Sequence, residues 1–161
     1  QSPAQAAPRQ EIAVVNVSKL FDGYEKTKEF DREFQTEGRI KQEERDAIVH
    51  EVRRLRDEQA LLSEDARQTK QGEIDEKLKE LDAFDLEVKR LLDTKRNRAI
   101  REVFEDIENH VELFGERKGY RFIMNDRALL YREDGLDITD SVMKELNDEF
   151  LRKKKGEKQA P

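Results

Sequence analysis

The chain has 161 residues, a mass of 19.0 kDa and a formal net charge of −6. This length suits one compact domain, or a small body with one long extension, but not two enzyme-sized domains. Charged residues make up 43% of the chain, against about 25% in an average globular domain, which is typical of coiled coils and long helices. The negative balance argues against a sequence-independent nucleic-acid binder, because such a protein needs a basic surface.

Several kinds of chemistry are excluded by what the sequence lacks. There is no cysteine, so disulfides, thiolate metal sites and cysteine nucleophiles are ruled out. His50 and His110 lie far apart on expected helices and are interpreted as ordinary helix residues rather than metal ligands. Glycine-rich phosphate loops and nucleophile-turn motifs are also missing. The sequence therefore predicts no enzyme, no nucleotide and no cofactor. Carboxylate clusters such as Glu105, Asp106 and Glu108 are interpreted as helix-surface charges.

The first segment, residues 1–10, combines proline with small residues and is predicted to be a flexible leader. The chain begins without methionine, so we expect a mature, exported product from which a targeting segment has been removed. No apolar run approaches the roughly 20 residues of a membrane-spanning helix.

Residues 11–17 predict a strand that is buried on both faces, because β-branched and apolar residues occupy successive positions. Ile12 and Val14 point to one face and Val15 and Val17 to the other. Ser18 is expected to cap a short helical turn that follows the strand.

Residues 24–114 contain no proline and predict an antiparallel helical hairpin. Gly72 lies near the middle and is the expected reversal point, with the tip near 63–73. Each arm of about 45 residues would reach roughly 65 Å at 1.5 Å per residue, so we expect the hairpin to project from a small body. Apolar residues spaced by three and four predict a coiled-coil-like seam, and they include Ile48, Val52, Leu55, Leu62, Ile74, Leu78, Leu81, Val88, Leu92, Val103, Ile107 and Phe114.

The seam has one weak stretch. The heptad pattern places Gly38, Lys41 and Arg45 where apolar side chains are expected. Because glycine costs about 1 kcal/mol relative to alanine in a helix, we predict that the arm bends here. The alternative is that a third helix or a register shift covers this stretch.

A group of large apolar residues lies on or beside the seam. Their side chains either form the hairpin core or, where they lie off the seam, are exposed to contact another chain. The group consists of Phe30, Phe34, Ile40, Phe84 and Phe104.

After Gly115 and Gly119 the pattern changes to short strands, one beginning at Tyr120 and another at 128–131. Thr139 is expected to cap a final helix. The resulting α+β body, from residues 11–23 and 115–151, has too little apolar surface to form a stable core in a single copy of the chain. We therefore predict that further copies of the chain complete it. The residues expected in that assembly are Ile12, Val14, Val15, Val17, Phe122, Ile123, Leu129 and Tyr131.

The last segment, residues 152–161, is predicted to be a flexible basic tail. Such a run could make weak contact with a membrane or a glycolipid. The alternative is a solvated end that complements the dipole of the preceding helix.

Two motifs bracket the predicted hairpin. Before it stands Ile12-Ala13-Val14-Val15-Asn16-Val17-Ser18-Lys19-Leu20-Phe21, and after it stand Gly119-Tyr120-Arg121-Phe122-Ile123-Met124, Tyr131, Leu136-Asp137-Ile138-Thr139-Asp140-Ser141-Val142 and Leu146-Asn147. In this order and at this separation, these segments resemble the Skp/OmpH family of periplasmic chaperones.

The resemblance implies a periplasmic homotrimer in which strands from three chains form the body and three hairpins surround a central cavity. It also implies an ATP-independent holdase that keeps unfolded outer-membrane or other exported proteins from aggregating. In that interpretation the client would be contacted by Phe30, Phe34, Ile40, Phe84 and Phe104. Flexibility of the arm near Gly38 would let the arms open for larger clients.

The net charge of this chain differs from that of the family. Well-known members are strongly basic, whereas this chain and its predicted tip are acidic, so long-range attraction of acidic clients is not expected. The family's glycolipid site is not matched by residues here. The competing hypothesis is an adaptor coiled coil that fixes the spacing between two components of the cell envelope.

Overall fold

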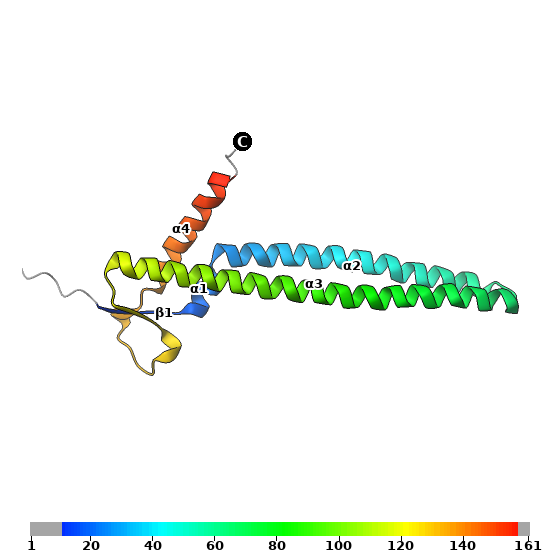
Figure 1. The fold of residues 1–161 in the computed structure, drawn as a ribbon, viewed down its shortest axis with the longest axis horizontal. Coiled ribbons are helices and arrows are strands. Elements are labelled where there is room, and N and C mark those ends of the chain that lie inside the picture. Colours follow the sequence, from blue (N-terminus) through cyan, green and yellow to red (C-terminus); the bar gives the residue numbers. More distant parts are fainter. Residues whose placement is uncertain (1–10, 158–161) are drawn as a thin grey trace, which may run out of the picture. The chain divides into compact units, whose positions relative to one another are not determined.

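The computed structural model describes residues 11–157 and shows a mostly helical chain with one small sheet (Figure 1). The long helical hairpin and the small sheet confirm the expected fold class. The elements, in chain order, are β1 (Ile12–Val15), α1 (Val17–Gly23), α2 (Glu25–Ala60), α3 (Glu64–Lys118), β2 (Phe122–Asn125), the 3₁₀ turns η1 (Asp126–Ala128) and η2 (Asp134–Leu136), and α4 (Thr139–Glu157). The expected leader, residues 1–10, lies outside the described residues.

The chain divides into two compact units. The sheet unit consists of the described residues up to Asp31 together with those from Ala99 onward, and the hairpin unit consists of Arg32–Arg98. The bounds of these units differ from residues 24 and 114, where the limits of the arm are expected. The first turns of α2 and the last turns of α3 belong to the sheet unit because Phe30 packs against its core and Ile107 and Phe114 are part of that core.

In the sheet unit, β1 and β2 pair in parallel, with Ile12 opposite Phe122 and Val15 opposite Asn125. The other edge of β1 carries a single bridge from Val14 to Asp137. The core beside this sheet is built from residues of β1, α1, α3 and α4 and from Tyr24 and Ile138, which precede α2 and α4. Its members are Ala13, Val15, Leu20, Tyr24, Val103, Ile107, Phe114, Ile138, Val142 and Leu146.

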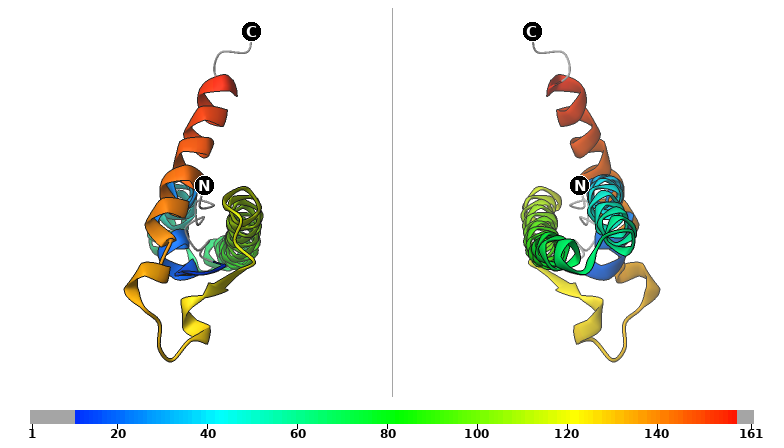
Figure 2. Two further views of the ribbon diagram at one scale, coloured as in Figure 1. Left: turned by 90° about the vertical axis from the view of Figure 1, so that its left-hand side faces the viewer. Right: turned by 90° about the vertical axis from the view of Figure 1, so that its right-hand side faces the viewer.

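The expected strand at residues 128–131 is not formed. Asn125 accepts a hydrogen bond from the Arg127 N–H, and the Leu129 N–H bonds to the Asp126 carbonyl, so the chain closes a 3₁₀ turn instead. Figure 2 shows the segment between β2 and α4 extending on the opposite side from the C-terminal end of α4.

The hairpin reverses earlier than expected. The chain turns at residues 61–63, where the N–H groups of Leu61 and Leu62 bond back to Glu58 and Gln59. Gly72 therefore lies inside α3 and does not form the reversal.

The final helix also differs from expectation. It continues to Glu157, so residues 152–157 are helical rather than a flexible tail. Two of the tail lysines are paired, Lys153 with Glu149 at 2.6 Å and Lys154 with Glu29.

Candidate functional surfaces

The two helices of the hairpin unit are held in one register by polar pairs across the seam. Arg45 donates two hydrogen bonds to Asp85, at 2.8 and 3.1 Å. On one side of this pair Lys95 contacts both carboxylate oxygens of Glu37, at 2.5 and 2.6 Å. Towards the turn, Gln59 bonds Gln71 at 2.9 Å. Because these pairs recur along the seam at similar antiparallel offsets, they indicate which residues of α2 and α3 face each other.

Apolar burial in the hairpin unit is confined to the end near the turn. Val52 and Leu55 of α2 and Ile74 of α3 are its buried residues. From 32 to 51 in α2 and from 75 to 98 in α3, no residue is buried. The middle of the hairpin therefore has half-buried apolar residues and charge pairs across the seam but no fully buried core, which agrees with the gap in the heptad pattern.

At this gap the surface is hollowed into a groove of about 300 Å³, which we call the seam groove. The three residues expected to loosen the arm line its α2 side, and apolar residues of α3 line the other. The lining comprises Gly38, Lys41, Gln42 and Arg45 from α2, with Phe84, Asp85, Val88, Lys89 and Leu92 from α3. No third element of the described chain lines it, which leaves the stretch uncovered.

The five apolar residues expected to contact a client are divided between the two units. Phe30 is half-buried and packs against the core of the sheet unit, below the ammonium group of Lys26. Phe104 belongs to the same unit and stacks on Phe21 at 5.0 Å. In the hairpin unit, Phe34 and Phe84 are half-buried and Ile40 is exposed. Of the five, only Phe84 lines the seam groove.

Sequence reasoning missed three exposed leucines of the hairpin unit. Leu61 stands at the turn with 89% of its surface exposed, and Leu86 and Leu91 are exposed on α3. The last two lie off the three-and-four spacing of Leu81, Val88 and Leu92, which is the signal that could have identified them.

The residues expected in an assembly of copies also fall into two groups. Val14 and Val15 are buried, with 1% and 3% of their surfaces exposed, and Val17 and Ile123 pack against the same core. These four stabilise the chain's own fold and offer little surface to a second copy.

The other group remains on the surface. Phe122 is 60% exposed, Ile12 and Tyr131 are also exposed, and Leu129 is half-buried. Sequence reasoning missed two exposed neighbours, Met124 and Leu130. Within residues 11–157, β2 pairs only with β1, so its second edge is open, and Phe122 and Met124 lie on this strand.

Asn16 joins three elements of the sheet unit. Its side chain accepts the Lys19 N–H at 2.7 Å, so Asn16 caps α1 in place of the expected Ser18. Its amide donates to Asp126 at 2.7 Å. Its backbone N–H donates to Thr139 Oγ1 at 2.8 Å. Thr139 thus bonds to Asn16, the residue after β1, rather than capping α4.

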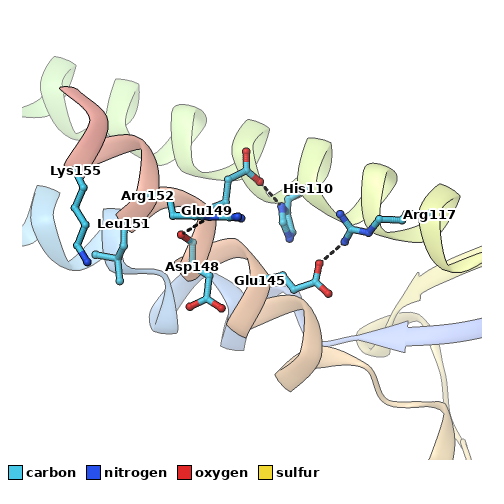
Figure 3. Close-up of a pocket in the computed structure, with 8 residues that line it drawn as sticks. All are labelled: His110, Arg117, Glu145, Asp148, Glu149, Leu151, Arg152 and Lys155. Carbon is cyan, nitrogen blue, oxygen red and sulfur yellow. Dashed lines mark hydrogen bonds and ion pairs between the residues drawn. The ribbon is translucent and has the colours of Figure 1, made fainter. Parts of the chain in front are cut away.

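Between α3 and α4 lies a polar cavity of about 430 Å³ in the sheet unit (Figure 3). His110 is 7% exposed, and its Nδ1 lies 3.1 Å from Glu149. A hydrogen bond from Lys153, together with His110, lowers the pKa of Glu149 against the effect of burial. Further along, Arg117 pairs with Glu145. These contacts join the two helices.

The part of the chain that the structure describes contains no cluster of three or more histidine, cysteine or acidic side chains placed to hold a metal ion. Within the same part, no helix has both the length and the apolar character needed to cross a bilayer.

One solved structure matches nearly the whole chain. It is the crystal structure, at 2.83 Å resolution, of an OmpH-like protein from Caulobacter crescentus CB15 that is named as an outer membrane chaperone. The TM-score is 0.72 over 92% of this chain and 89% of that chain, at 14% sequence identity. Such a likeness shows that the two chains share a fold.

No curated protein sequence matches the chain. The model of the family described as outer membrane protein (OmpH-like) matches residues 11–146. This range includes β1, both helices of the hairpin, β2 and the first part of α4. The resemblance drawn from the two bracketing motifs is thereby confirmed: the chain belongs to the OmpH-like outer membrane protein family.

Proposed function

We propose that this chain is an ATP-independent chaperone that binds unfolded outer-membrane proteins and keeps them from aggregating. The observation that carries the proposal is the long hairpin whose middle has no buried residues while several large apolar side chains remain partly exposed. Exposed apolar groups on a soluble surface are typical of sites that contact other chains.

A client of this class supplies the matching chemistry. The strands of an outer-membrane barrel alternate apolar and polar residues. Before they pair, their open edges and apolar faces promote aggregation. Scattered apolar contacts among dense charges would hold such a chain weakly at many points and keep other unfolded chains away.

Self-assembly is part of the proposal. Three copies would join through the open edge of β2, where Phe122 and Met124 are exposed, and through the exposed Tyr131. An open edge presents unpaired backbone groups, so a strand from a second copy would satisfy those groups and bury the apolar side chains. The three hairpins would then enclose the client.

Family membership further supports a location outside the cytoplasm, in the periplasm, and a function without catalysis. The solved OmpH-like neighbour is named as an outer membrane chaperone, which agrees with this proposal. Because the chain is acidic overall, client capture would rest on apolar contact and not on long-range attraction of anionic segments.

Light scattering of the purified chain, alone and with an unfolded outer-membrane barrel protein diluted from urea, tests the proposal. We expect a mass three times the 19.0 kDa of the chain and a complex of that assembly with one client. In the absence of ATP, the client should not aggregate. A monomer that leaves the client to aggregate would refute the proposal. A trimer that ignores the unfolded protein would favour a structural spacer of the envelope.

A further inference from the structure

The apolar floor of the seam groove is not covered by the chain itself. Phe84, Val88 and Leu92 occupy seam positions of α3 yet are only half-buried. Opposite them stands Gly38, where an added Cβ would meet no atom of another element within 4 Å. In an ordinary seam a side chain from α2 would fill this space, so the groove has room for a side chain from elsewhere.

The charges around the groove are largely neutralised by partners. Arg45 is paired with Asp85 at 2.8 Å, and Lys41 is paired with Glu44 at 2.8 Å. Among the described residues, the ammonium group of Lys89 has no partner, and it is exposed at the groove. The rim therefore offers one free positive charge beside an apolar floor.

We propose that the seam groove binds one large apolar side chain of an unfolded polypeptide, with an acidic residue of the same segment pairing with Lys89. The volume of about 300 Å³ accommodates one large side chain and its adjoining backbone, not a folded element. The charge complementarity selects a segment in which an apolar residue stands beside a carboxylate. This inference rests on the proposed function, since it assigns a place where the client is held.

Two polar pairs across the seam lie at or near the groove. Arg45 and Asp85 line it directly, and the Glu37–Lys95 pair joins the helices at a position where no residue is buried. An incoming side chain competes only with these solvent-accessible pairs and not with a packed core.

The chain contains no tryptophan, so Phe84→Trp places a single indole reporter in the groove. The probe is a short synthetic peptide that alternates phenylalanine with serine and carries one glutamate. We expect its addition to shift the indole emission to shorter wavelength in a saturable way. A peptide with serine in place of every phenylalanine should leave the emission unchanged, and one with glutamine in place of glutamate should bind more weakly.

Two glycines provide a matched pair of variants on the Phe84→Trp background. Gly38→Leu places an apolar side chain into the groove, whereas Gly72→Leu makes the same change in α3, where an added Cβ also meets nothing within 4 Å. Both changes remove a helix-weakening glycine. We expect Gly38→Leu to weaken peptide binding by about tenfold, the effect of losing the burial of one large side chain, and Gly72→Leu to leave binding unchanged.

Equal peptide affinities in the two leucine variants would overturn the inference, as would an indole that does not respond to the peptide. A shift that grows with protein concentration alone would also overturn it, because a second copy would then occupy the groove. The proposed function is tested separately: if the parent chain prevents aggregation of the barrel protein and Gly38→Leu does so equally well, the groove assignment fails and the chaperone proposal stands.

Discussion

Asn147 of α4 caps the start of α2 by accepting the backbone N–H of Glu25 on its side-chain oxygen, at 2.8 Å. Its amide nitrogen donates to the carbonyl of Gly23, the last residue of α1, at 3.1 Å. One side chain therefore satisfies backbone groups on both sides of the break at Tyr24. Helix ends leave such groups without partners inside the helix.

We expect Asn147→Leu to lower the free energy of unfolding by about 2 kcal/mol, because it leaves two backbone groups unpaired and removes a helix cap. Urea unfolding followed by circular dichroism measures this change. Asn109→Leu is the control, since Asn109 is an exposed residue of α3 whose side chain makes no hydrogen bond among the described residues. Similar losses in both variants would argue against the capping role.

If the Arg45–Asp85 pair stabilises the hairpin, exchanging the two charged residues should preserve part of that stability. Arg45→Asp and Asp85→Arg should each destabilise the hairpin, because each places like charges across the seam, and the double swap should recover part of the loss. The coupling should shrink in concentrated salt, which screens exposed charges. A double-mutant cycle in urea at low and high salt measures it. Additive effects of the two changes would contradict the pairing.

Asp137 predicts a loss of stability in acid. Burial raises its pKa, but hydrogen bonds from Thr139 and the charge of Arg132 outweigh burial and lower the pKa below its usual range. A carboxylate whose pKa is lower in the folded state contributes stability above its unfolded pKa, and this contribution disappears as the pH falls through the folded pKa.

We therefore expect Asp137→Asn to reduce the difference between the urea midpoints measured near neutral pH and in acid. Asp134→Asn, at an exposed position nearby, serves as the control and should preserve the difference. An unchanged pH dependence in Asp137→Asn would refute the assignment.

Two glycines should respond to alanine in opposite directions. Gly119, after α3, has a φ of 79°, which is unfavourable for any residue with a Cβ, so Gly119→Ala should cost about 1–2 kcal/mol. Gly72 lies inside α3 with open space around it, so Gly72→Ala should gain up to about 1 kcal/mol. Thermal unfolding of both variants checks the signs, and a loss in Gly72→Ala would contradict its helical placement.

The open edge of β2 predicts where assembly can be blocked. Phe122→Lys should lower the mass in solution from trimer to monomer, because it places a charge in the apolar surface proposed to be buried between copies. Leu61→Lys makes the same kind of change at the hairpin turn, where the side chain is exposed, and should leave the mass unchanged. A trimeric Phe122→Lys variant would move the interface elsewhere.

The hairpin could be predicted because helix periodicity and the absence of proline extend over its whole length. Its reversal was misplaced because glycine costs only about 1 kcal/mol inside a helix, which the rest of α3 outweighs. The better signal was Ser63 followed by Glu64 and Asp65, since serine and acidic residues favour the start of a helix.

The seam groove was partly visible in the sequence as three seam positions without apolar side chains. The pairing of Arg45 with Asp85 across it was not, because acidic residues are so frequent on both helices that no single pairing stands out. The strand expected at residues 128–131 failed for a related reason. Leu129 and Tyr131 have the composition of a strand, but no segment within residues 11–157 pairs with them as a strand.

The parallel pairing of β1 with β2 has a consequence for how the chain folds. Ile12 and Phe122 are 110 residues apart, and closing a flexible loop of that length costs roughly 4 kcal/mol in chain entropy. Helices form within about a microsecond, so a hairpin that forms first brings the two ends together at far smaller cost. The sheet should then appear late in refolding, at a rate set by the helical turn at residues 61–63 rather than by the strands themselves.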